Sequence, residues 1–331
     1  MSMKPAPASS PGPSLEPEFR GRVYDSIIET IGATPLVRLS RLAEDQGVKA
    51  EILAKCEFFN PLGSVKDRIG IAMVEAAERQ GRIKAGSTLI EPTSGNTGIS
   101  LAFVCAAKGY RLILTMPESM SEERRKMLKL LGAEIELTPA ELGMRRAIER
   151  AEELVEETPG AIMLQQFTNP ANPEIHRHTT AEEIWIDTGG RVDAIVTGVG
   201  TGGTLTGCAQ VLKPRNPGLL IVAVEPEDSP VLSGGMPGPH KIQGMGPGFI
   251  PEVLDIEAID KILKIGSESA FEMARRVARL EGLAVGMSSG AALAAALEVG
   301  AQEDMAGKVI VTFLPDFADR YLSTALFDGL G

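Results

Sequence analysis

The sequence predicts an α/β protein built around mainly parallel, twisted sheets. Short apolar runs typical of strands alternate with helix-length segments along most of the 331 residues. Several helical segments end at a glycine, such as Gly81 and Gly109, and glycine is the residue that most often closes a helix. Aromatic residues make up only 4% of the chain, whereas glycine and alanine are plentiful. Such small side chains favour tightly packed α/β layers over a β-sandwich.

The alternation can be followed element by element. The expected strands cover residues 50–58, 87–92, 110–117, 133–139, 192–199 and 219–227. The expected helices cover residues 64–81, 96–109, 121–132, 144–160, 202–213 and 285–297. Strand–helix repeats of this kind predict parallel sheets with helices packed on their faces.

Two segments depart from this pattern. Residues 1–20 are rich in proline and serine and poor in apolar side chains, which predicts a disordered tail. Residues 225–255 are rich in glycine and proline. A loop of that length within a compact domain indicates a functional or mobile segment.

Composition argues against several classes of function. The net charge is −11 and no block of lysine or arginine stands out, so no nucleic-acid binding is expected. Apolar runs are too short to span a bilayer, and the first twenty residues lack a basic-then-apolar secretion signal, so a cytoplasmic location is expected. Cys56, Cys105 and Cys208 have unrelated spacings, and no Cys or His pair has zinc-like spacing. We therefore expect buried, reduced thiols and no metal site.

The first candidate ligand loop is "EPTSGNTG", residues 91–98, between a strand and a helix. Ligands of parallel sheets bind at the carboxyl ends of strands, where the next helix offers unpaired N–H groups to an anion. Four polar side chains surround the two glycines of the loop: Thr93, Ser94, Asn96 and Thr97. An ordinary helix cap would explain one of them but not four. The loop therefore predicts a binding site.

The second candidate is "TGVGTGGTLTG", residues 197–207. Its G-x-G-x-x-G spacing and Glu225 at the end of the next strand match a dinucleotide fingerprint, so an NAD-dependent oxidoreductase is one hypothesis. Thr201 and Thr204, however, add hydroxyls to the backbone N–H groups, which suits a terminal phosphate monoester. The unit also lies late in the chain, after several other strand–helix pairs.

A third loop opens the helix at 285–297. Ser288 or Ser289 can cap this alanine-rich helix, and the other serine is then available to contact a ligand. Capping alone would account for one of the two hydroxyls.

Lys66, in "NPLGSVKDR", lies in the first turn of a helix, where the helix dipole disfavours a cation. The P-loop pattern G-x-x-x-x-G-K-[ST] is absent, so Lys66 is not a nucleotide-phosphate lysine of that class. A solvated surface lysine is the ordinary alternative. A lysine that loses its proton becomes a nucleophile, however, and a phosphate cradle beside such an amine fits pyridoxal 5′-phosphate (PLP).

From about Ile27 to Tyr321 the chain resembles the cysteine synthases, the A-type O-acetylserine sulfhydrylases of the β-family (fold type II) PLP enzymes. The motifs that carry the resemblance are "NPLGSVKDR", "EPTSGNTG", "MSEERRKMLKLLGAE", "QQFTNPANPEIHRHTT", "GVGTGGT", "HKIQGMGPGFIP", "GMSSGAA" and "RYLST". The resemblance implies two three-layer α/β domains with PLP in the cleft between them. The smaller domain would comprise residues 21–37 and 60–168, and the larger one residues 38–59 and 169–331.

The resemblance also implies roles for individual residues. Lys66 would carry the cofactor as an imine and act as the catalytic base, Asn96 would bind the ring hydroxyl, and Ser288 would meet the ring nitrogen. The cofactor phosphate would be held by Gly200, Thr201, Gly202, Gly203 and Thr204. The amino-acid carboxylate would be bound by Thr93, Ser94, Gly95, Thr97 and Gln166. Gly244 would lie in the loop over the active site.

The implied reaction is β-replacement, in which O-acetyl-L-serine loses acetate to give an α-aminoacrylate and sulfide adds to form L-cysteine. A homodimer is implied, and the C-terminal tail of serine acetyltransferase is an implied partner. Two other hypotheses stay open: a cystathionine β-synthase, which shares "TSGNTG" and "GTGGT", and a non-catalytic binding module on the same scaffold. Retention of Lys66 argues against the second of these.

The sequence departs from the family pattern at four positions. Ala318 and Asp319 stand where Gly-Glu is usual before Arg-Tyr-Leu-Ser, and Met287 and Pro247 stand where Ile and a smaller residue are common. These changes bear on substrate choice and loop mobility. They do not touch the residues assigned to PLP.

Overall fold

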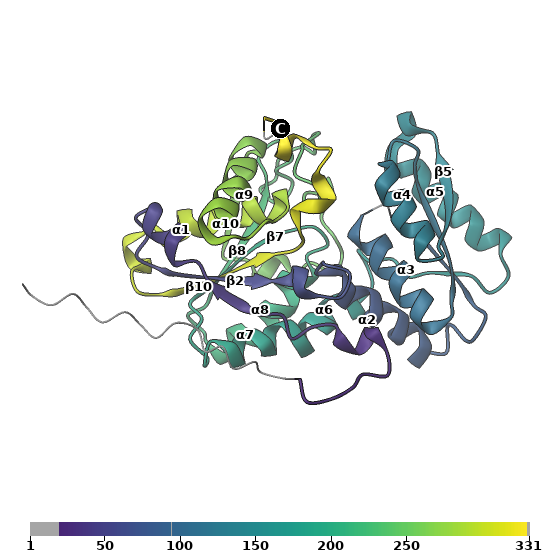
Figure 1. The fold of residues 1–331 in the computed structure, drawn as a ribbon, viewed down its shortest axis with the longest axis horizontal. Coiled ribbons are helices and arrows are strands. Elements are labelled where there is room, and N and C mark those ends of the chain that lie inside the picture. The colour runs from purple at the N-terminus through teal and green to yellow at the C-terminus, as the bar shows by residue number, and fades with distance from the viewer. Residues whose placement is uncertain (1–19, 94, 330–331) are drawn as a thin grey trace, which may run out of the picture.

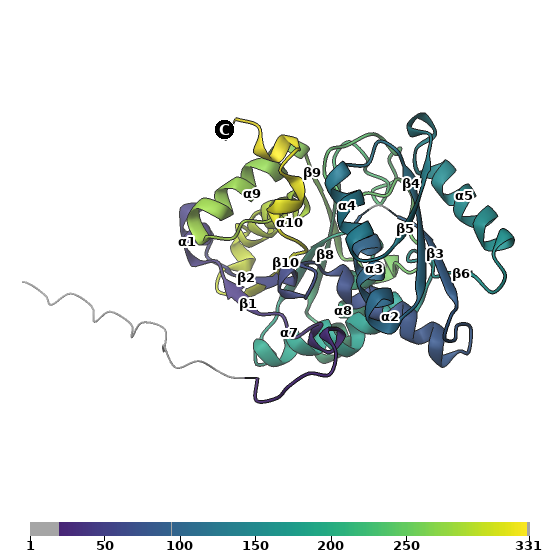
Figure 2. The same cartoon turned by 45° about the vertical axis from the view of Figure 1, so that its right-hand side comes forward.

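A computed structural model describes residues 20–93 and 95–329. The predicted tail lies outside the described residues except for Arg20, and so does Ser94. The chain forms two α/β bodies side by side, each with its own sheet (Figures 1 and 2). This confirms the predicted fold class.

The larger sheet has six strands in the order β1-β2-β10-β7-β8-β9. Their bounds are β1 Leu36–Arg38, β2 Glu51–Cys56, β7 Ala194–Gly198, β8 Leu220–Pro226, β9 Lys261–Ile265 and β10 Val309–Leu314. Only β1 is antiparallel to its neighbour, and the other pairs are parallel. The N-terminal strand β2 pairs with the C-terminal strand β10, with Ile52 opposite Ile310. The segment that leads to Lys66 is thereby attached to the larger sheet.

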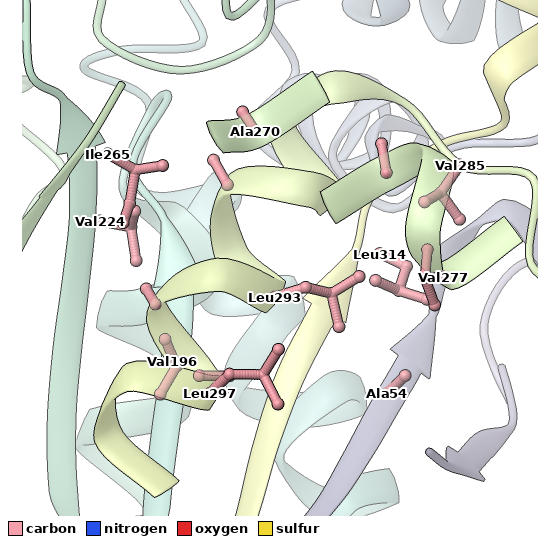
Figure 3. Close-up of a cluster of buried hydrophobic side chains, with 14 of the residues drawn as sticks. Ala54, Val196, Val224, Ile265, Ala270, Val277, Val285, Leu293, Leu297 and Leu314 are labelled. Atoms are coloured by element: carbon pink, nitrogen blue, oxygen red, sulfur yellow. The ribbon is translucent and has the colours of Figure 1, made fainter. Parts of the chain in front are cut away.

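Alternate residues of these strands face opposite layers, as the twofold period of a strand requires. Ile52, Ala54 and Val196 pack against α9 (Ser267–Glu281) and α10 (Met287–Gly300), with α1 (Ser40–Asp45) at the edge of this layer. Figure 3 shows Leu293 and Leu297 of α10 directed at the sheet. The opposite layer consists of α7 (Ala181–Asp187) and α8 (Gly203–Arg215), which pack on Leu53, Ile195 and their neighbours.

The smaller sheet has four parallel strands in the order β5-β4-β3-β6. Their bounds are β3 Thr88–Pro92, β4 Arg111–Pro117, β5 Glu134–Thr138 and β6 Ile162–Met163. One face is covered by α2 (Lys66–Arg79), α3 (Asn96–Lys108) and α4 (Glu122–Leu130). The other face is covered by α5 (Gly143–Glu157).

A bent helical segment links the two bodies. It consists of α6 (Ala171–Ile175), a π-helical turn over His176–Thr180, and α7. Ala171 packs in the core of the smaller body, whereas Ala181 and Ile184 pack in the larger one. A π-helical turn inside a helix is frequently found at a functional site.

Short 3₁₀ turns complete the chain. They lie at Ile27–Thr30, Glu57–Phe59, Ala140–Leu142, Ile256–Ala258, Glu303–Met305, Ala318–Tyr321 and Ala325–Phe327. Residues 227–255 contain no helix or strand, as their glycine and proline content predicts. Within the described residues no helix is long and apolar enough to cross a membrane. The three cysteines are buried and free of disulfides.

The predicted domain boundaries stay a prediction, with one observation that bears on them. Leu36 and Val37, assigned by sequence to the smaller domain, pair with β2 in the larger sheet. The helix α2, which follows β2 closely in sequence, packs instead in the smaller body. The chain therefore crosses between the bodies just before Lys66.

Candidate active site

A cavity of about 510 Å³ lies between the two bodies, and a smaller pocket of about 50 Å³ adjoins it. Lys66, Asn96, Gly200, Thr201, Gly244 and Met245 line both. The outer cavity also has Thr93, Gly95, Thr97 and Gln166 in its wall, and the inner pocket has Gly202, Thr204 and Ser288. Gly203 starts helix α8 beside them. The predicted site residues that the structure describes therefore gather around one space.

Lys66 begins α2 at the junction of the two bodies. The residue before it, Val65, donates its backbone N–H to the carbonyl of Pro315 at 2.9 Å, so the start of α2 is tied to the end of β10. Burial lowers the pKa of the Lys66 amine, while the negative charges of Asp316 and Glu57 act in the opposite direction. A half-buried amine that gives up its proton more readily than a surface lysine suits a nucleophile or a base.

A buried ionic cluster holds helix α2 two residues beyond Lys66. The Arg68 guanidinium donates to Glu57 Oε2 and to Glu183 Oε1, each at 2.7 Å. Lys55 Nζ lies 2.7 Å from the other oxygen of Glu183. Two cations thus face two carboxylates, which compensates their desolvation. The cluster joins β2, α2 and α7, so it fixes the helix that carries Lys66.

The loop from Gly200 to Thr204 includes the N-terminus of α8 and lies beside the inner pocket. A Cβ on Gly200 would lie 2.4 Å from the carbonyl oxygen of Gly244, and a Cβ on Gly203 would lie 1.8 Å from Asn172 Oδ1. Asn172 is buried, and its Nδ2 donates to Thr201 Oγ1 at 2.9 Å and to the carbonyl of Gln166 at 2.8 Å. Only glycine fits at both loop positions, so the backbone can close around a small anion.

The wall on the side of the smaller body is set by Glu91 at the end of β3. Its carboxylate accepts the backbone N–H groups of Leu164, Gln165 and Gln166 at 3.0, 3.0 and 3.2 Å. Gln165 has a positive φ of 61°, a conformation that side chains rarely adopt without such support. Thr97 Oγ1 then donates to Gln166 Oε1 at 2.7 Å. Glu91 therefore shapes the loop in which Gln166 meets Thr97.

The alternative use of Glu225 as a nucleotide ligand does not agree with its contacts. Its carboxylate accepts the backbone N–H groups of Leu232 and Ser233 at 2.7 and 3.1 Å. Glu225 is absent from the walls of both cavities. Glu225 thus holds the loop after β8, and the carboxylate that would bind a nucleotide ribose in a dinucleotide site is already used.

Comparisons with known proteins agree with this geometry. The sequence model of the family described as pyridoxal-phosphate dependent enzymes matches residues 27–316. The chain belongs to this family. A cysteine synthase of Staphylococcus aureus is 55% identical over 304 residues, which cover 92% of this chain and 97% of that one.

Solved structures of related enzymes have the same fold. The cysteine synthase (OASS) of Entamoeba histolytica superposes with a TM-score of 0.92 at 46% identity and covers 94% of this enzyme and 93% of that chain. An O-ureido-L-serine synthase superposes with a TM-score of 0.90 at 44% identity, covering 94% and 97%. PLP is the cofactor of this enzyme, as predicted.

The described residues fit that cofactor. The glycine positions of the Gly200–Thr204 loop leave room for a phosphate at the N-terminus of α8, where backbone N–H groups point outward. Lys66 and Ser288 line the same pocket and supply an amine and a hydroxyl. Among the described residues no cluster of His, Cys, Asp or Glu could hold a metal ion.

Several residues of the site were not singled out by sequence. Glu91 and Asn172 stand inside quoted motifs, yet their roles depend on backbone groups distant in sequence. Asp316 follows the last strand and lines the inner pocket, and the hydroxyl of Tyr321 donates to its carboxylate from behind. The mouth of the cavity is lined by the apolar side chains of Met144, Ile148 and Phe249, for which the sequence gives no local signal.

His176 lies behind the Gly200–Thr204 loop in the π-helical turn. Its Nε2 is 3.2 Å from Thr204 Oγ1, and its Nδ1 is 2.8 Å from Thr180 Oγ1. Burial and the nearby charges of Arg68 and Lys66 lower the pKa of His176 to about 3. The imidazole is therefore neutral in the folded enzyme at neutral pH and joins Thr204 to the linking helix.

This pKa predicts a loss of stability in acid. In the unfolded chain, His176 binds a proton below its ordinary pKa of 6.5, whereas in the folded protein it stays neutral down to about pH 3. The folded state therefore loses stability relative to the unfolded state as the pH decreases through this range. The gap between the two pKa values corresponds to about 5 kcal/mol at most. Replacing His176 by glutamine should flatten the pH dependence of urea unfolding between pH 7 and 4. The exposed His178 is the matched control, and an equal flattening in His178→Gln would contradict the assignment.

Proposed function

We propose that the enzyme makes L-cysteine from O-acetyl-L-serine and sulfide, with release of acetate. One observation carries the proposal: the half-buried Lys66 amine and the Gly200–Thr204 loop face one pocket, beside the polar loop 93–97. The similarity to cysteine synthases of Staphylococcus aureus and Entamoeba histolytica supports this choice of substrates.

The proposed roles follow the family resemblance and, except for Ser94, the position of each residue in or beside the cavity wall. The phosphate of PLP binds to Gly200, Thr201, Gly202, Gly203 and Thr204, Ser288 contacts the ring nitrogen, and Asn96 contacts the ring hydroxyl. The carboxylate of the amino acid binds to Thr93, Ser94, Gly95, Thr97 and Gln166. Gly244 lies in the loop over the active site and lines both cavities. The Glu91 contacts support this arrangement because they fix Gln166 beside Thr97.

Bound PLP supplies an electrophilic carbon and an electron-withdrawing ring that acidifies the Cα–H bond of the amino acid. Lys66 Nζ takes the Cα proton, because its lowered pKa increases the share of neutral amine that can accept a proton. Loss of acetate follows, sulfide forms the new carbon–sulfur bond at Cβ, and Lys66 returns the proton to Cα. Ser288, which lines the inner pocket, would offer the ring nitrogen a neutral hydroxyl in place of a carboxylate, an arrangement that would suit loss of a β-substituent.

The reaction can be tested with two substrate pairs. O-acetyl-L-serine alone should change the visible spectrum of the bound cofactor, and sulfide should then restore it and release cysteine. L-serine with homocysteine should react poorly. Faster turnover of that second pair would identify a cystathionine β-synthase. A colourless protein that binds NAD and is unaffected by borohydride would contradict the assignment altogether.

We also propose that the enzyme is a homodimer in the cytoplasm. The rings of Phe58 and Phe317 lie 4.3 Å apart between centroids and are tilted by 43°, and Phe59 lies 5.3 Å from Phe58. Phe59 and Phe317 are exposed, as is Leu322 further along the chain. A second copy of the chain covering this area would remove it from water. Sedimentation should then give twice the mass of 35.1 kDa, and a monomer at micromolar concentration would contradict the proposal.

The C-terminal tail of serine acetyltransferase is the proposed protein partner. Its terminal carboxylate would occupy the loop 93–97, and its apolar last residue would contact the mouth of the cavity, where Met144, Ile148 and Phe249 lie. A peptide ending in isoleucine should compete with O-acetyl-L-serine. If the rate is unchanged at saturating peptide, this partner is wrong.

A further inference from the structure

The carboxylate of Asp316 has no role in the reaction described so far. Asp316 follows Pro315 at the end of β10, and its side chain is only 1% exposed. It lines the inner pocket together with Lys66 and Ser288. Burying an unpaired carboxylate is costly, so the contacts that Asp316 makes in the wall of this pocket must compensate for its desolvation.

The contacts of Asp316 lead to Asn96. Asp316 Oδ2 accepts the Nδ2 group of Asn96 and the hydroxyl of Tyr321, each at 2.6 Å. On the opposite side of the amide, Arg320 Nη1 donates to Asn96 Oδ1 at 2.7 Å. Both ends of the Asn96 amide are therefore held from the larger body. One N–H of Nδ2 remains for a ligand, because the other is donated to Asp316.

The second oxygen of Asp316 provides an independent observation. Oδ1 is buried and makes no hydrogen bond with any described residue. It lies against Gly286, where a Cβ would come within 2.2 Å of it. The backbone at Gly286, just before α10, is therefore so close to Asp316 that no side chain would fit between them. The carboxylate is kept in place by packing on this side and by hydrogen bonds on the other.

The charged and titratable groups around Asp316 come from α2, α4 and the segment after β10. Lys66 of α2, Arg124 of α4, and Arg320 and Tyr321 after β10 act on its pKa or its partners. Burial raises the pKa of Asp316, while the hydrogen bonds from Tyr321 and Asn96 oppose the rise. Neither protonation state removes Oδ2 as the acceptor for the Asn96 amide.

We propose that Asp316 is a positioning residue, which orients the Asn96 amide so that its remaining N–H points at the ring hydroxyl of PLP. The inference rests on the proposed role of Asn96. Without Asp316, the Asn96 amide keeps only its hydrogen bond from Arg320 to Oδ1, and its Nδ2 group is free to change direction. The donor to the ring hydroxyl is then no longer fixed, and the electronic state of the ring changes with it.

The test uses four variants of the full-length enzyme: Asn96→Ala, Asp316→Ala, the double variant and Asp316→Asn. Apoenzyme is titrated with PLP, and the position of the visible band and the dissociation constant are measured. Asp316→Ala should weaken PLP binding about tenfold and shift the band in the same direction as Asn96→Ala, because the hydrogen bond that orients the Asn96 amide is lost. In the double variant the loss should not exceed that of Asn96→Ala, since coupled residues are not additive. Asp316→Asn should recover most of the loss, because its amide oxygen accepts the same bond.

Two controls separate positioning from folding. Asp319→Ala removes the same charge from an exposed site in the same segment and should change neither quantity. Tyr321→Phe removes the other donor to Oδ2 without touching Asn96, and should leave the band in place. Additive losses in the double variant, or a Tyr321→Phe shift equal to that of Asp316→Ala, would overturn the inference. If Asn96→Ala itself leaves the spectrum unchanged, the proposed role of Asn96 fails instead.

Discussion

Turnover is expected to fall by more than about a thousandfold in Lys66→Ala, while the protein stays folded and retains PLP without a covalent bond. The loss follows from the two roles proposed for one amine, since general-base catalysis alone contributes about 10²- to 10⁴-fold. The phosphate loop and Asn172 lie on other elements and do not depend on the lysine side chain. The cofactor should therefore dissociate on dialysis faster than from the wild type.

The measurement combines steady-state rates with borohydride reduction followed by mass spectrometry. Borohydride should fix PLP to the wild-type chain at Lys66 and should fix none to the variant. Exposed Lys84 offers a matched control, and Lys84→Ala should behave as the wild type. If Lys66→Ala retains more than a tenth of the wild-type rate, another group removes the proton and the mechanism is wrong.

Gly203→Ala should weaken PLP binding by about 100-fold and destabilise the fold by about 3 kcal/mol. The added methyl group would lie 1.8 Å from Asn172 Oδ1, so Asn172 must move. Its Nδ2 then loses the bonds to Thr201 Oγ1 and to the carbonyl of Gln166. Both the phosphate loop and the substrate wall are held by this one amide, so a single methyl group disturbs both.

Gly218→Ala provides the control for the same chemical change at a surface turn. The nearest atom to a Cβ at Gly218 is Asn216 Oδ1 at 3.5 Å, which is ordinary contact. PLP titration and urea unfolding should distinguish the two variants. Equal PLP affinity in Gly203→Ala and the wild type would show that the loop does not bind the phosphate. The double variant Gly203→Ala with Asn172→Ala should recover part of the stability, since the clash is removed.

Local sequence patterns predict much of this structure because the elements involved are defined by near neighbours. The helix expected over 96–109 is observed as Asn96–Lys108 with Gly109 in the left-handed conformation, as the glycine stop predicts. The strand expected over 219–227 is β8, Leu220–Pro226. The first two candidate loops follow β3 and β7 and start α3 and α8, so their exposure to a ligand follows from their place in the strand–helix unit. The third loop follows α9 instead of a strand.

Sequence spacing could not decide between two uses of the glycine loop. The G-x-G-x-x-G pattern and Glu225 satisfy a dinucleotide fingerprint in sequence. Only the tertiary structure shows that the Glu225 carboxylate is taken by the backbone of Leu232 and Ser233. A carboxylate at the end of a strand can turn toward a ligand or toward its own loop, and the spacing is the same in both cases.

By itself, the sequence determined the α/β class, because that class depends on strand–helix units defined by near neighbours, and it predicted Lys66 and three ligand loops that the structure brings to one cavity. The tertiary structure alone decided that β2 pairs with β10, that Asn172 contacts Gly203, and that Asp316 holds Asn96 from 220 positions away in the chain. Such contacts have no local signature, because neither partner is restricted by its immediate neighbours. They form only when the two bodies pack around the cavity, and they fix the orientation of side chains whose presence the motifs had already indicated.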